Sequence, residues 1–374
     1  MNKIAGVFAA LQVIAASAAG AGTVAQIQTS SGLTWTVQDL IVGTTSTATS
    51  AGGGDPIYNA AMPKYSGVVA LVMNYGAAGI GICSGSLLSG SNSILTAAHC
   101  LSNQGVRPLS TTAYFYGGSN PDTFVPGNPA STAVAISYYS INPNYTGANL
   151  DQNDIAVLRL AAPAPTFATG YDLYTGTNLT GLEFNMAGYG DRSNVGGALG
   201  YVDPSYGILR QGNNRYDFSF GDPDFGGYLA SPTAAGLYLA DFDNGLAAND
   251  AACKLAANFG LSGPKYCNTG VGALEAIAGP GDSGGPNFIN GQIASITEAG
   301  LTLGTANGDI DGKLNGTFGE FNALLPVANQ IAWIESVVPE PSSWALLITG
   351  FGVVGASARR ARRRAAALGD RLAA

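Results

Sequence analysis

The stretch from Gly279 to Pro286 reads GPGDSGGP and places Ser283 between an aspartate and two glycines. Acyl transfer on a serine needs a hydroxyl that stands clear of the backbone and N–H groups that point at the developing oxyanion. Glycine permits the tight turn that brings the N–H groups of Gly281 and Ser283 toward one point. A glycine-rich turn with no chemical role is the alternative, because the chain contains 53 glycines.

A serine nucleophile needs a base, and the chain offers a single histidine for that role. His99 lies in the segment TAAHC, after an apolar, strand-like approach. A third group must orient the imidazole, and Asp154 opens the segment DIAVLRL. Asp151 is a nearby competitor for the same role.

The segments TAAHC, DIAVLRL and GDSGGP, in this chain order, strongly resemble the trypsin/chymotrypsin-like serine protease family. The resemblance implies an all-β fold of two six-stranded antiparallel barrels, with the active site between them and a short C-terminal helix. It implies that Ser283 is the nucleophile, His99 the base and Asp154 the orienting carboxylate. Gly281 and Ser283 would form the oxyanion hole, and the substrate would be a polypeptide.

The pattern of short apolar runs separated by glycine- and asparagine-containing turns also predicts successive strands. These runs are residues 68–73, 81–88, 93–97, 113–116, 133–138 and 155–160. Both faces of the last run are largely apolar, which favours a strand buried in a barrel.

Four cysteines in an exported chain favour disulfides. The family resemblance implies a Cys83–Cys100 bond that pins the histidine loop. Cys253 and Cys267 then close a 15-residue loop. No metal site is expected from the cysteines, because the only histidine has another role and no CxxC spacing occurs.

The predicted specificity pocket departs from the family pattern. Six residues before the nucleophile stands Ile277, which cannot pair with a cation, so trypsin-like specificity is disfavoured. The strand of Ser295, Ile296 and Thr297 resembles the strand that binds the substrate backbone, and Thr297 is expected to narrow the pocket. The resemblance also implies that Ser295 donates a hydrogen bond to Asp154. A small-to-medium apolar substrate side chain is the resulting hypothesis.

Residues 22–56 are rich in Ser, Thr, Gly and Ala and are predicted to be a leader or propeptide. In the resembled family, cleavage frees an apolar N-terminus whose ammonium pairs with the aspartate before the nucleophile, here Asp282. Ile41 has the more similar local sequence, whereas Ile57 has the more typical spacing to His99 and is slightly preferred. A leader with no activating role remains the alternative.

The first 21 residues have the pattern of a cleaved secretory signal: Lys3, an apolar run and small residues at the end. A signal peptidase is therefore an expected processing enzyme. Residues 57–338 contain 9 basic and 20 acidic residues, which argues against nucleic acid as a partner, because its phosphates would be repelled.

The C-terminal residues 339–374 begin with Pro-Glu-Pro, continue as an apolar run over 344–358 and end in an arginine-rich segment. The run is shorter than a full membrane span, which favours transient insertion over a permanent anchor. This arrangement resembles the PEP-CTERM sorting signal of Gram-negative bacteria. The resemblance implies processing by an exosortase and a location in the envelope, at the surface or outside the cell.

The protease-like domain is predicted to cover residues 57–338, with an insertion at about 191–250. The predicted insertion contains acidic residues that offer oxygen ligands for calcium. They include Asp222, Asp224 and the segment DFDNG at 241–245. They lack the spacing of a calcium loop, so turns are the favoured interpretation and no cofactor is expected.

Two other functions are consistent with parts of the sequence. One is a protease-fold protein of the cell surface or matrix that binds without catalysis. The other is an esterase, which uses the same chemistry, but its nucleophile elbow, a sharp turn from a strand to a helix, is absent. The intact set of three motifs favours a serine endopeptidase.

Overall fold

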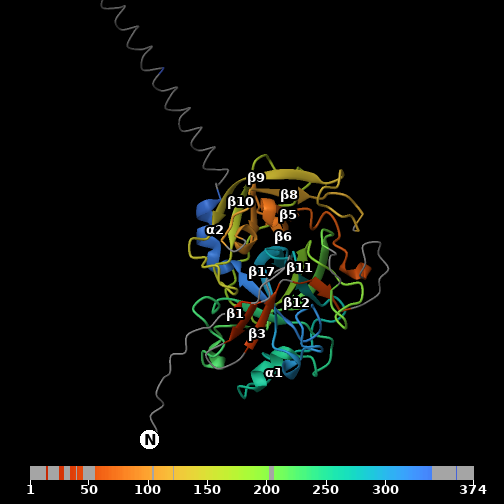
Figure 1. Ribbon diagram of the computed structural model, residues 1–374, viewed down its shortest axis with the longest axis vertical. Helices are drawn as coiled ribbons and strands as arrows, with labels where there is room; N and C mark the ends of the chain where they lie inside the picture. The colour runs from red at the N-terminus through yellow and green to blue at the C-terminus, as the bar shows by residue number, and fades with distance from the viewer. Residues whose placement is uncertain are drawn as a thin grey trace, which may run out of the picture.

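The computed structural model describes residues 14–15, 25–28, 34–38, 40–44, 55–102, 105–120, 122–201, 206–338 and 359. Figure 1 shows a β-barrel at one end of the molecule and a large sheet at the other, with α2 beside the barrel. Among the described residues, no helix has the length and apolar character needed to cross a membrane. The predicted tail segment 344–358 lies outside the described residues.

The first half of the domain is a closed antiparallel barrel in the order β10-β7-β6-β5-β8-β9. Its strands are β5 (Val68–Asn74), β6 (Ile80–Leu87), β7 (Ser93–Thr96), β8 (Ser110–Phe115), β9 (Thr132–Ile141) and β10 (Ala156–Leu160). β-branched and apolar residues favour strands of this kind, because they pack on a pleated surface. The first predicted barrel is therefore confirmed, and its core includes the fully buried Leu71 and Phe115.

The second half is a ten-stranded sheet, which is larger and more open than the predicted six-stranded barrel. Its described strands are β1 (Ile14–Ala15), β2 (Ala25–Gln28), β3 (Thr34–Gln38), β11 (Glu183–Gly188), β12 (Arg210–Arg215), β13 (Phe218–Ser219), β14 (Tyr238–Asp241), β16 (Pro286–Ile289), β17 (Gln292–Thr302) and β18 (Phe321–Pro326). β17 is the central strand, because it pairs with β16, β18 and β3. A separate pair joins β15 (Ala276–Gly279) to β4 (Leu40–Gly43).

The stretch 191–250 contributes to this sheet. Within it, β12 pairs with β11 and β14 pairs with β18. Much of the predicted insertion is therefore part of the second half of the fold.

The described structure also contains two short α-helices, α1 (Ala251–Ala257) and α2 (Ile331–Val337). Asp250 caps α1 by accepting a hydrogen bond from the Cys253 N–H. Gln330, just before α2, accepts a hydrogen bond from Asn142 at 2.9 Å and donates one to the Gln152 carbonyl at 2.8 Å. The predicted C-terminal helix therefore returns to the barrel and joins the two halves of the domain.

Both expected disulfides form. Cys83 on β6 bonds to Cys100, and Cys253 on α1 bonds to Cys267. The first crosses from a barrel strand to the loop that carries His99, whereas the second closes a local loop.

Replacing both Cys253 and Cys267 by serine is expected to lower the free energy of unfolding by about 3 kcal/mol, because a loop of this length loses its entropic constraint. Denaturant unfolding measures this change. Under native conditions, Ser283 in the protein with its mature N-terminus is expected to keep its reactivity toward a fluorophosphonate probe. The Cys83→Ser/Cys100→Ser variant is the comparison and should lose that reactivity as well. Equal behaviour of the two variants would contradict these separate roles.

Candidate active site

His99 follows barrel strand β7 and opens a short 3-10 helix, η3 (His99–Leu101). The Cys83–Cys100 bond fastens the residue next to it to β6. The histidine loop is therefore held at both the strand end and the disulfide.

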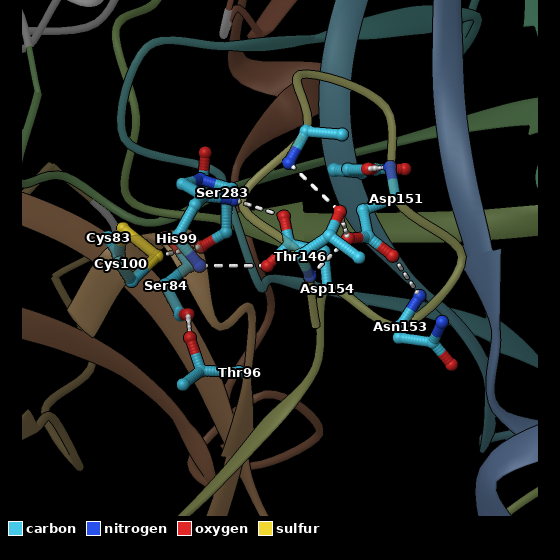
Figure 2. A network of polar contacts seen from close by, with 12 residues as sticks. Cys83, Ser84, Thr96, His99, Cys100, Thr146, Asp151, Asn153, Asp154 and Ser283 are labelled. Carbon is cyan, nitrogen blue, oxygen red and sulfur yellow. Dashed lines mark hydrogen bonds and ion pairs between the residues drawn. A yellow bond between two sulfur atoms is a disulfide. The ribbon is translucent and has the colours of Figure 1, made fainter. Parts of the chain in front are cut away.

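Asp154, which precedes β10, makes two contacts with His99 (Figure 2). One carboxylate oxygen, Oδ2, lies 2.5 Å from the imidazole Nδ1, and the other accepts the His99 backbone N–H at 2.8 Å. The carboxylate is buried, whereas the imidazole retains 28% exposure. This geometry holds Nδ1 as the proton donor to Asp154, which leaves Nε2 as the nitrogen that can accept a proton.

Asp151, the competing aspartate, has a different role. Its Oδ2 accepts hydrogen bonds from the Thr146 N–H at 2.7 Å and hydroxyl at 2.6 Å, and its Oδ1 accepts the Asn153 N–H at 2.9 Å. Its own carbonyl accepts the Asp154 N–H at 2.8 Å. Asp151 therefore shapes the loop that presents Asp154.

Ser84 on β6 connects the barrel to the turn that carries Ser283, a role that sequence analysis did not identify. Its N–H donates to the Ser283 carbonyl at 2.9 Å, and its hydroxyl donates to the Gly281 carbonyl at 2.9 Å. The same hydroxyl accepts the Tyr189 N–H at 2.9 Å. The Ser283 carbonyl also lies 3.7 Å from Cys100 Sγ, so the serine turn adjoins the histidine loop.

The Ser283 turn presents three groups of interest. The Ser283 hydroxyl is buried and makes no hydrogen bond with the described part of the chain. The backbone N–H groups of Gly281 and Ser283 likewise donate to no other described residue. Gly281 has a φ of 97°, a conformation that glycine adopts readily. These two N–H groups are available to a developing oxyanion.

Asp282 is buried between the turn and β11. It accepts hydrogen bonds from Gly190 N–H at 2.8 Å and Gly279 N–H at 2.7 Å. A Cβ at Gly188 would stand 2.0 Å from its Oδ1, and one at Gly190 would stand 2.5 Å from its Oδ2. Glycines at the end of β11 and just beyond it therefore make room for this carboxylate.

The expected contact of Ser295 with Asp154 is wrong. The Ser295 hydroxyl lies 2.7 Å from the Tyr216 hydroxyl, inside the second half of the domain. Three residues further along β17, Glu298 reaches the aspartate loop and accepts the Asp151 N–H at 2.5 Å. Glu298 is the only charged residue of β17, which was the available signal, because a buried carboxylate requires a partner.

The predicted pocket residues lie on two strands and are all buried. Ile277 on β15 packs in a cluster with Val42, Phe242 and Phe318. Ile296 is fully buried, and Thr297 uses its backbone to bond Gly284 and Gly285. The Ile277 side chain is therefore buried in this cluster, with Val42 of β4 as its register partner.

The two candidate N-termini have different surroundings. Val42 is fully buried and is the register partner of Ile277, which places Ile41 opposite Ala278. Ile57 is 40% exposed, and its N–H donates to Asp55 Oδ1 at 3.0 Å. β4 therefore brings Ile41, rather than Ile57, to the strand that leads to Asp282.

Comparison with known protein families finds two matches. The family model for Trypsin matches residues 54–205, and the model for the PEP-CTERM protein-sorting motif matches residues 337–364. Both resemblances predicted from the sequence are confirmed for these regions. The first match includes His99 and Asp154 and ends before Ser283. No curated protein matches the chain.

Gly284 is expected to be intolerant of alanine, because a Cβ there would stand 2.1 Å from Thr96 Oγ1 and 2.5 Å from the Ala97 nitrogen. In the protein with its mature N-terminus, Gly284→Ala should therefore displace the Ser283 turn and abolish labelling of Ser283 by a fluorophosphonate probe.

Gly291→Ala is the matched control, because Gly291 has a φ of 79° against 75° for Gly284 but has open space around its Cβ. It is expected to cost about 1 kcal/mol of stability and to keep the labelling. Similar labelling of both variants would show that the close approach at Gly284 is unimportant.

Proposed function

We propose that this chain, which carries a trypsin domain region and a PEP-CTERM sorting motif, is an exported serine endopeptidase. The observation that carries the proposal is the contact of the only histidine, His99, with the buried Asp154 beside the Ser283 turn. A paired imidazole, a hydroxyl and two available N–H groups are the elements that acyl transfer requires.

In the proposed reaction, the Ser283 Oγ attacks the peptide carbonyl carbon while His99 Nε2 takes the hydroxyl proton. The carbonyl oxygen becomes an oxyanion and accepts hydrogen bonds from Gly281 and Ser283. His99 then gives its proton to the leaving amine, and the C–N bond breaks to leave an acyl-enzyme. Water then attacks the acyl-enzyme carbonyl carbon while His99 takes its proton. His99 returns this proton to Ser283 Oγ as the carboxylic acid leaves, and Asp154 stabilises the imidazolium in both halves of the reaction.

The specificity proposed here is for an apolar side chain of small to medium size. Ile277 lies in an apolar cluster with Phe242 and Phe318, where a cationic substrate group would find no carboxylate partner among them. This supports a protease that does not select lysine or arginine.

Export and sorting are proposed to use the two ends of the chain. Residues 1–21 act as a cleaved signal, and the tail inserts transiently in the membrane until an exosortase-type enzyme cuts near Pro339. The sorting motif at 337–364 supports a destination in the envelope, on the surface or outside a Gram-negative cell.

Each of Ser283→Ala and His99→Ala is expected to lower kcat by about 10⁴-fold or more, and the double variant should lose little beyond either single change. Asp154→Asn should lower kcat by a comparable factor, because it removes the carboxylate that fixes the imidazole tautomer. Peptide hydrolysis by the protein with its mature N-terminus measures these effects. Additive losses from Ser283 and His99, or fluorophosphonate labelling that persists in Ser283→Ala, would contradict the assignment.

We also propose that the protein is exported as a zymogen and that cleavage between Leu40 and Ile41 activates it. Before cleavage, leader strand β3 pairs with Gly300–Thr302 of β17, the strand that resembles the substrate-binding strand. β4 already lies on β15, which supports insertion of a new Ile41 ammonium beside Asp282. Such a cation would stabilise the buried carboxylate, and release of β3 would free the edge of β17.

An enteropeptidase site tests the position of this cut. Replacing residues 36–40 with Asp-Asp-Asp-Asp-Lys should make peptide hydrolysis dependent on added enteropeptidase, with Ile41 as the new N-terminus by mass spectrometry. The control carries the same site at residues 52–56, so that cleavage frees Ile57. Activation of the control alone would transfer the role to Ile57, and full activity before any cleavage would overturn the zymogen proposal.

A further inference from the structure

A cluster of three buried aspartates lies in the second half of the domain, outside the proposed catalytic residues. Asp241 ends β14, Asp243 follows two residues later and Asp250 caps α1. One carboxylate oxygen from each lies within 4.8 Å of the others. Their exposed fractions are only 2%, 3% and 2%.

Hydrogen bonds satisfy some of the oxygens of these carboxylates, but not all of them. Asp241 Oδ2 accepts the Ala252 N–H at 2.7 Å, and Asp250 Oδ1 accepts the Cys253 N–H at 2.7 Å. Asp243 Oδ1, in contrast, is buried and has no hydrogen-bond partner among the described residues. An unpartnered buried carboxylate oxygen is costly unless a proton or a cation neutralises it.

Two more buried carboxylates increase the negative charge around the cluster. Asp217 accepts the Asp241 N–H at 2.9 Å, and Glu275 accepts the Asp243 N–H at 2.7 Å. Arg215 forms an ion pair with Asp217 at 3.1 Å, so its guanidinium is already paired with a carboxylate at the edge of the cluster. So many buried carboxylates in one place favour a bound cation, because each buried negative charge needs a compensating partner.

We infer that Asp241, Asp243 and Asp250 form a binding site for a calcium ion. Calcium takes six to eight oxygen ligands, many of them carboxylates, and water completes such sites. The ion would give Asp243 Oδ1 its missing partner and would let the aspartates remain ionised. Zinc is disfavoured because it prefers nitrogen and sulfur ligands, and Cys253 and Cys267 beside the cluster form a disulfide.

The location gives the ion a structural role in the second half of the domain. It would join the end of β14 to the start of α1 through three side chains. The Asp243 N–H also donates a hydrogen bond to Glu275. Glu275 immediately precedes β15, the strand that carries Ile277. Calcium is accordingly expected to stabilise the fold and to keep the strand before the nucleophile in place.

An oxygen-rich loop at residues 309–320 provides an internal control. Both carboxylate oxygens of Asp309, of Asp311 and of Glu320 accept hydrogen bonds from described donors. Because no carboxylate oxygen in that loop lacks a donor, the unpartnered oxygen distinguishes the cluster around Asp243.

The test uses the purified full chain carrying Ser283→Ala, which prevents self-digestion and makes the result independent of peptidase activity. After EDTA treatment and removal of the chelator, calcium chloride should bind with a stoichiometry of one to the cluster in isothermal titration calorimetry. At 100-fold excess over Kd, it should raise Tm by about 5 °C. Asp243→Asn and Asp250→Asn should each remove this binding, whereas Asp311→Asn should keep it.

Three results would overturn the inference. One is the absence of calcium binding and of a Tm shift in the chelator-treated protein. Another is calcium binding that Asp243→Asn and Asp250→Asn leave unchanged but Asp311→Asn removes. The third is an Asp243→Asn variant that is more stable than its parent in EDTA and in calcium alike, which would show that a protonated carboxyl group occupies the cluster.

Discussion

The contacts of Ser84 join the two halves of the candidate active site. His99 and Asp154 come from the barrel, whereas Ser283 follows β15 and precedes β16 in the second half. The Ser84 N–H and hydroxyl bond the carbonyls of Ser283 and Gly281, and its own carbonyl accepts the Thr96 hydroxyl at 2.8 Å. A single barrel residue therefore fixes the serine turn relative to the strand that leads to His99.

Buried carboxylates are a second constraint on the structure, because each needs a partner. These partners differ from one carboxylate to the next. Asp154 is paired with an imidazole, and Asp282 receives N–H groups from two glycines. Glu298 receives the Asp151 N–H. The cluster around Asp243 brings three buried aspartates together and retains an oxygen without a donor among the described residues, which is why a metal ion is inferred there.

The proposed activation depends on the strands that precede residue 44. β3 pairs with β17, and β4 pairs with β15, the two strands on which the predicted pocket residues lie. Val42 of β4 packs with Ile277, Phe242 and Phe318, and this contact would remain after a cut before Ile41. Loss of β3 would expose the edge of β17, whereas the pairing of β4 with β15 would remain.

The sequence by itself determined the family resemblance, the barrel strands and the identities of His99, Asp154 and Ser283 as candidates, because the short motifs require particular side chains in a fixed order. It also correctly paired the four cysteines. The side-chain partners were decided only by tertiary structure: Ser295 bonds Tyr216, Glu298 approaches the aspartate loop, and Ser84 holds the serine turn. These contacts depend on strand register and on approaches between segments distant in the chain, which local residue patterns do not specify.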